Sequence, residues 1–154
     1  MTRRARVERF FSPEEEARIL EAIRRAEGAT SGEIRVHVET TCPGDPMEVA
    51  RNRFARLGMA ATAARNGVLF YLATRDGRFA VIGDEGIHRE VGDPFWAELR
   101  DRMAARFRAD DFAVGLEEAI AAVGAHLARA FPVGVHDVNE LPDAISWEEK
   151  DPPN

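Results

Sequence analysis

The sequence predicts an α/β domain in which helices cover both faces of a mixed sheet. Helical and strand patterns follow one another in the order α-β-α-β-β-α-α. The run NGVLFYLA at residues 66–73 is almost continuously apolar, which is typical of a central strand buried on both faces. The run EIRVHVE at residues 33–39 alternates strictly between apolar and polar residues, as expected of a strand whose two faces differ.

The first predicted element is a helix that begins after Ser12. Ser12 is a good N-cap, Pro13 suits the first helical position, and Glu15 completes a capping box. Gly28 is the predicted stop. The residues expected on the apolar face of this helix are Ala17, Ile19, Leu20, Ile23 and Ala26.

The middle of the chain predicts two further strands and one helix. After the strand at residues 33–39, we expect a helix at about residues 45–57 and then the central strand. TRDG at residues 74–77 makes a turn, and RFAVIG at residues 78–83 is the returning strand of a hairpin. The polar side of the first strand would be buried only if another layer covered it; its residues are Glu33, Arg35, His37 and Glu39.

Two more helices are predicted, at about residues 93–106 and 111–130. Their inner faces are marked by Phe95, Trp96, Leu99, Met103 and Phe107 in the first, and by Leu116, Ile120, Val123 and Leu127 in the second. The stretch VIGDEGIHREVGD at residues 81–93 leads into the first of these helices. Its polar part is predicted to be an acidic loop.

The chain is divided into a basic arm at residues 1–9, one domain at residues 10–131 and an acidic tail at residues 132–154. The tail has no periodic pattern, but it carries large apolar residues among its acids. A tryptophan exposed on a free tail would promote association, so we expect the tail to pack on the domain itself. The apolar residues concerned are Leu141, Ile145 and Trp147.

Charge and composition exclude several classes of protein. A net charge of −6 and a pI near 5.3 argue against a nucleic-acid binder, which would present a basic face to phosphates. No apolar stretch approaches the roughly 18 residues of a membrane span. Cys42 is alone, so no disulfide forms within one chain, and no signal-peptide core follows the basic start. We therefore expect a cytoplasmic protein.

The common catalytic motifs are missing from the sequence. It contains no GxxxxGK[ST] loop, GxGxxG, HExxH, GxSxG or EF-hand loop. What remains is a set of acids at the ends of predicted elements: Asp84, Glu85, Asp93, Asp110 and Asp111.

These five acids have two interpretations. Asp93, before Pro94, and Asp110 or Asp111 are placed to cap helices, each stabilising by about 1 kcal/mol without any function. Alternatively, strand and helix ends converge at one sheet edge, where open α/β sheets bind ligands. Carboxylates gathered there would require a hard cation such as Ca²⁺ or Mg²⁺ between them.

Among the histidines and the cysteine, only His88 is singled out by its position. It lies in the acidic segment, where carboxylates would favour its protonated form or a metal would recruit its neutral imidazole. His37, His126 and His136 are expected to be packed or surface residues. Cys42 lies in the predicted loop TTCPGDP with no activating base nearby in sequence.

Four features between residues 10 and 131 carry a resemblance: the capped first helix, TSGEIRV leading into a strand, the central NGVL, and DDFAVGL at the start of the last helix. With these features the chain resembles the TPM domain family. The ending DVNELPDAI resembles a short bacterial branch without signal peptide or membrane anchor.

The resemblance implies a three-layer α/β/α sandwich with a mixed sheet of about four strands. It also implies divalent-cation binding, especially of calcium, and in some members acid phosphatase activity or a role in membrane-protein maintenance or receptor assembly. The family pattern Gly-x-Gly-aliphatic-Glu, followed by Asp, corresponds here to DEGIH and Asp93. Asp84 thus replaces the first glycine and His88 the glutamate, and imidazole is a poor ligand for a hard cation.

Two functions follow from different classes. The first is a non-catalytic binding or regulatory module with an unidentified protein partner, which can be membrane-associated, and with a divalent cation on Asp84, Glu85, Asp93, Asp110 and Asp111. The second is a metal-assisted phosphomonoester hydrolase with His88 as general acid or base. The first is preferred because the sequence offers no evident nucleophile.

Overall fold

The computed structural model describes residues 10–133 and 144–147, and its strands form one mixed sheet. The strand order is β3-β2-β1-β4. Strand β1 is parallel to both of its neighbours, whereas β3 returns antiparallel to β2 as the predicted hairpin. The strands are β1 (Glu33–Glu39), β2 (Gly67–Ala73), β3 (Arg78–Gly83) and β4 (Ala144–Trp147).

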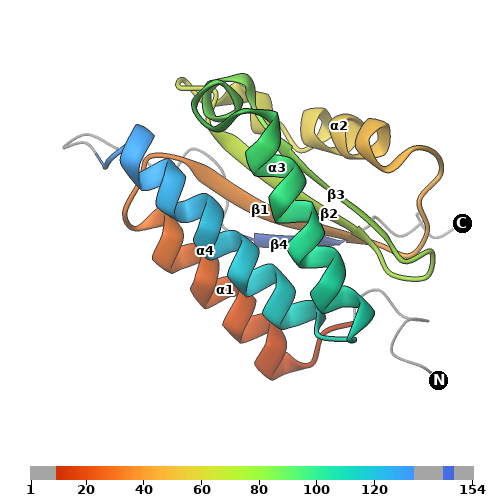
Figure 1. Ribbon diagram of the computed structural model, residues 1–154. Helices are drawn as coiled ribbons and strands as arrows, with labels where there is room; N and C mark the ends of the chain where they lie inside the picture. Colours follow the sequence, from red (N-terminus) through yellow and green to blue (C-terminus); the bar gives the residue numbers. More distant parts are fainter. Residues whose placement is uncertain (1–9, 134–143, 148–154) are drawn as a thin grey trace, which may run out of the picture.

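Helices cover both faces of this sheet, which confirms the predicted three-layer α/β/α sandwich (Figure 1). One layer consists of α1 (Pro13–Glu27), α3 (Glu85–Arg108) and α4 (Phe112–Ala130). The other face carries α2 (Pro46–Arg56), which packs on β2 and β3 and is followed by the short helix η3 (Met59–Ala61). No helix in the described ranges is long and apolar enough to cross a bilayer.

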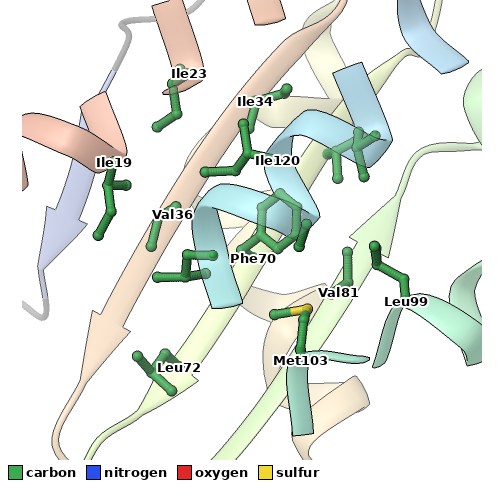
Figure 2. Close-up of a cluster of buried hydrophobic side chains, with 14 of the residues drawn as sticks. Ile19, Ile23, Ile34, Val36, Phe70, Leu72, Val81, Leu99, Met103 and Ile120 are labelled. Carbon is green, nitrogen blue, oxygen red and sulfur yellow. The ribbon is translucent and has the colours of Figure 1, made fainter. Parts of the chain in front are cut away.

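The main core lies between the sheet and the layer of three helices (Figure 2). Apolar residues alternate along β1 and β2, so that one set from each strand points into this layer. Opposite them lie the apolar stripes of the helices, as their spacing predicts. Buried residues of this core include Ile19, Ile23, Val36, Phe70, Leu99, Met103 and Ile120.

The first helix begins as its sequence predicts. The Ser12 hydroxyl accepts a hydrogen bond from the Glu15 backbone at 3.1 Å, and the Glu15 carboxylate accepts one from the Ser12 backbone at 2.9 Å. This reciprocal capping box satisfies two backbone donors that the helix itself leaves unpaired. The helix ends at Gly28.

The prediction of an acidic loop before residue 93 is wrong. Helix α3 begins at Glu85, with Asp84 as its N-cap, and continues across a kink at Gly92, whose φ of 73° lies in the left-handed region. The reason is the apolar spacing hidden among the charges, because Ile87 is fully buried and Val91, one turn later, packs on the core. The acids of this segment are therefore held on a helix.

The expectation that the tail packs on the domain is confirmed for residues 144–147. They form β4, a strand that pairs in parallel with β1 from Arg35 to Val38. Ile145 and Trp147 pack against the main core, while Leu141 lies outside the described residues. Four residues with two large apolar side chains are too short a pattern to predict a strand from sequence.

Substitution of Ile120 tests the packing of α4 on the sheet. The side chain is fully buried, so Ile120→Ala is expected to lower the free energy of unfolding by about 2–5 kcal/mol. The exposed neighbour Ala121 provides the control. Ala121→Ser is expected to change the free energy of unfolding by about 0.5 kcal/mol or less. Urea unfolding of both variants measures the difference, and equal stabilities would contradict the described core.

Candidate functional site

The five predicted acids do not lie at one edge of the sheet. Asp84, Glu85 and Asp93 lie in and before the first part of α3, whereas Asp110 and Asp111 lie beyond its last residue. The helix from residue 93 to residue 108 alone spans about 24 Å at 1.5 Å per residue. This length exceeds the few ångströms over which carboxylates share one cation, so the two groups cannot form a common site.

Asp84 is buried, and its carboxylate is paired with a positively charged side chain. Its side chain is 6% exposed, and its two oxygens accept hydrogen bonds from Arg65 Nε at 2.8 Å and Arg65 Nη2 at 2.9 Å. One of these oxygens also accepts from the backbone of Glu85 at 2.7 Å, which caps α3. These bonds raise the pKa of the Arg65 guanidinium above its usual value. The pair is the bidentate arrangement in which arginine binds carboxylates most strongly.

The other polar groups of this part of α3 lie more openly. The Glu85 side chain is 62% exposed, with one oxygen 3.4 Å from Arg65 Nη1. His88 Nδ1 accepts a hydrogen bond from Trp96 Nε1 at 3.0 Å, and its Nε2 lies 3.5 Å from an oxygen of Asp93. The side chain of Asp93 is 93% exposed. His88 is thus oriented by a tryptophan and one solvent-exposed acid.

Asp110 and Asp111 form the turn between α3 and α4. Asp110 has a left-handed φ of 65°, and its backbone donates to the carbonyl of Phe107 at 3.0 Å. Asp111 occupies the N-cap position of α4, but its side chain makes no capping hydrogen bond. Asp111 therefore stands at the position that the capping interpretation predicts, but its side chain does not cap the helix.

Within residues 10–133 and 144–147, no group of three or more histidine, cysteine, aspartate or glutamate side chains is arranged to hold a metal ion. A calcium ion requires six to eight oxygen ligands. At the start of α3, the carboxylates of Asp84 and Glu85 already face the guanidinium of Arg65, and the exposed Asp93 lies beyond the kink at Gly92. The residues present do not fit a divalent cation there.

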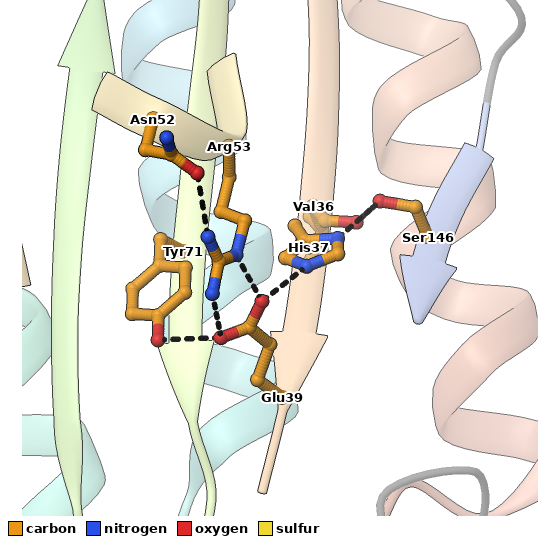
Figure 3. Close-up of polar contacts among 7 residues, drawn as sticks. All are labelled: Val36, His37, Glu39, Asn52, Arg53, Tyr71 and Ser146. Carbon is orange, nitrogen blue, oxygen red and sulfur yellow. Dashed lines mark hydrogen bonds and ion pairs between the residues drawn. The ribbon is translucent and has the colours of Figure 1, made fainter. Parts of the chain in front are cut away.

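A second polar cluster lies at the end of β1, on the face of the sheet that α2 covers (Figure 3). Its centre is the buried carboxylate of Glu39. This carboxylate accepts hydrogen bonds from Tyr71 Oη at 2.9 Å, from His37 Nε2 at 3.0 Å and from Arg53, whose Nη2 contact is 3.3 Å. His37 Nδ1 lies 2.8 Å from the hydroxyl of Ser146 in β4. The cluster therefore joins β1, β2, α2 and the tail strand.

The charges of this cluster depend on one another. Burial raises the pKa of Glu39, but hydrogen bonds from His37, Arg53 and Tyr71 and the charge of Arg53 outweigh it and lower that pKa to about 2. Burial and the charge of Glu39 raise the pKa of Tyr71, whose phenol stays protonated and donates. Glu39 is therefore an ionised acceptor whose partners are all supplied by the chain.

The sequence contains a signal for this cluster in its first strand, although the pattern alone does not identify the cluster. Polar residues alternate with apolar ones along residues 33–39, and the structure buries His37 and Glu39 on the polar side. Burial of a charged residue in a strand indicates a partner from another element. That the partners are Arg53 and Tyr71 depends on the packing of α2 and the register of β1 with β2.

The comparisons with known proteins agree with this architecture. The profile of the TPM domain matches residues 6–126. The chain belongs to the TPM domain family. No match was found among the curated proteins.

Solved structures of similar fold cover most of this TPM-domain chain. The NMR structure of the BA42 protein from the psychrophilic bacterium Bizionia argentinensis is 42% identical, with a TM-score of 0.84 over 94% of this chain and 99% of that one. The N-terminal domain of a P. gingivalis protein is 21% identical, with a TM-score of 0.63 over 79% and 78% of the two chains. That of the cg2496 protein from Corynebacterium glutamicum is 14% identical, with a TM-score of 0.61 over 94% and 84%. The last two likenesses concern the fold alone.

The lowered pKa of Glu39 predicts a pH-dependent contribution to stability. A carboxyl with a lower pKa in the folded state contributes stability that is present above its unfolded pKa and is lost as the pH falls towards the folded value. For Glu39 this window runs from about pH 4.5 down to about 2. Glu39→Gln is therefore expected to destabilise the protein by about 2 kcal/mol at pH 7. The difference from the wild type should shrink through that window.

Urea unfolding at several pH values measures this difference. The exposed acid Glu90 provides the control, because Glu90→Gln removes the same charge without a buried partner. We expect its stability profile to follow that of the wild type. A constant difference between Glu39→Gln and the wild type from pH 7 to pH 2 would contradict the role of Glu39 as the ionised centre of the cluster.

Proposed function

We propose that this TPM-domain chain is a non-catalytic binding or regulatory module with a protein partner. The observation that carries the proposal is the separation of the predicted site residues. His88 and Asp84 lie at one end of α3, Asp110 and Asp111 lie at the other, and Asp84 is bound to Arg65. Metal-assisted hydrolysis needs its cation, its water and its general acid or base within a few ångströms of the phosphoryl group.

The partner is expected to be a protein, and the proposal covers membrane-associated proteins as well. The net charge of −6 disfavours nucleic acid. The cytoplasmic location and the cation on the acids remain predictions from the sequence. The geometry at the start of α3 does not favour the cation, because its most buried oxygens are already hydrogen-bonded.

An assay for phosphomonoesterase activity tests the proposal against its alternative. The purified protein is expected to hydrolyse p-nitrophenyl phosphate no faster than a preparation of a His88→Ala variant, with Ca²⁺ or Mg²⁺ present and across acidic and neutral pH. A hydrolase that uses His88 as general acid or base should lose about 10²–10⁴-fold in this variant.

His126 provides the matched control for this assay. It is a half-buried histidine of α4 whose ring packs on Phe95, with ring centroids 4.5 Å apart. Turnover that is lost in His88→Ala and kept in His126→Ala would establish the phosphatase and overturn the proposal. Equal turnover in all three proteins would assign the activity to a contaminant or another site, and leave His88 without a catalytic role.

A further inference from the structure

The buried carboxylate at the start of α3 is surrounded by donors that the chain itself supplies. Asp84 accepts two hydrogen bonds from the guanidinium of Arg65, at 2.8 and 2.9 Å, and one from the backbone of Glu85. A second carboxylate, that of Glu85, lies 3.4 Å from the same guanidinium. Arg65 therefore stands between two adjacent acids, which is the place that a cation would occupy.

The backbone holds Arg65 in this position. Its φ of 53° is left-handed, an uncommon conformation for a residue with a side chain, and its backbone donates to the carbonyl of Thr62 at 3.2 Å. Its own carbonyl accepts from Gly86 at 2.8 Å. The turn before β2 is thus fastened to the first turn of α3 by backbone and side chain together.

Gly86 is required by this close approach. A Cβ atom at this position would lie 2.3 Å from the carbonyl oxygen of Ala64 and 2.6 Å from that of Arg65. Both are backbone atoms that cannot rotate away. The contact with the turn that carries Arg65 therefore explains why position 86 in DEGIH is a glycine. No role in a metal site is needed to account for it.

The remaining polar groups nearby do not complete a metal site. Asp93 is 93% exposed and faces His88, whose other nitrogen accepts from Trp96. The positive end of the helix dipole also favours the two acids at the start of α3. The carboxylates are therefore stabilised without an ion from solution.

We propose that the guanidinium of Arg65 is the resident cation of the first turn of α3, and that it makes this part of the domain independent of divalent cations. The guanidinium binds both oxygens of Asp84 in one plane, which a spherical ion cannot do without further oxygen ligands. The inference does not depend on the partner proposed above, and it concerns the state of the fold alone.

The first test uses the unaltered protein. When calcium or magnesium is titrated into the metal-stripped protein, its Tm is expected to equal that of the same protein in the presence of a chelator. An ion that bound only the folded state at this site would raise the Tm by mass action. A rise in the wild type that disappears in Asp84→Asn would overturn the proposal.

The second test removes the guanidinium. Arg65→Asn suits the left-handed backbone, leaves Asp84 buried without its partner, and is expected to lower the Tm by roughly 10 °C. Millimolar calcium should recover part of this loss, because the vacated space lies between two carboxylates. The double variant Arg65→Asn/Asp84→Asn should show no calcium response. An unchanged Tm in Arg65→Asn, or a loss that neither calcium nor magnesium reduces, would contradict the proposal.

The Asp84→Asn variant keeps the proposal testable if Arg65→Asn does not fold. Asparagine retains the cap of α3, and the Arg65 left behind is 43% exposed and can be solvated. Asp84→Asn is therefore expected to be more stable than Arg65→Asn, because an unpaired buried charge costs more than an unpaired exposed one. The opposite order would show that Arg65 does not neutralise Asp84.

Discussion

The burial of β2 on both faces is the constraint on which the rest of the structure depends. All seven of its residues are buried, and its backbone is paired with β1 on one side and β3 on the other. A strand of this kind must be covered by two layers. Phe70 and Leu72 are covered by the layer of three helices, whereas Tyr71 and Ala73 lie under α2. The three-layer architecture follows from this single apolar run.

Covering both faces also buries carboxylates, and two of the buried ones are each matched by an arginine. Glu39 is bound by Arg53 and Asp84 by Arg65. Both arginines come from the connection between β1 and β2, so this crossover supplies the charges that the sheet ends need. The first pair fastens α2 to the end of β1, and the second fastens the turn before β2 to the start of α3. Breaking either would leave a buried charge unpaired, which is costly.

The family fold and the two buried ion pairs account for different features of this structure. The family and its solved relatives account for the fold. The carboxylates of Glu39 and Asp84 are hydrogen-bonded by donors of the chain itself, and the acids near α3 are divided between its two ends. This arrangement is typical of groups that hold elements together.

The sequence by itself determined the layers and most of the elements, but neither β4 nor the first part of α3. The capping box at Ser12, the alternation along residues 33–39 and the apolar run at residues 66–73 are local patterns, and each produces the element it predicts because the relevant contacts lie within a few residues. Only the tertiary structure decided where the charges meet. Asp84 and Arg65 are brought together by the return of β3 beside β2, and Ser146 reaches His37 across a large separation in sequence. Such contacts depend on register and helix placement, which no local pattern contains, and so the acids were expected at one edge although the length of α3 separates them.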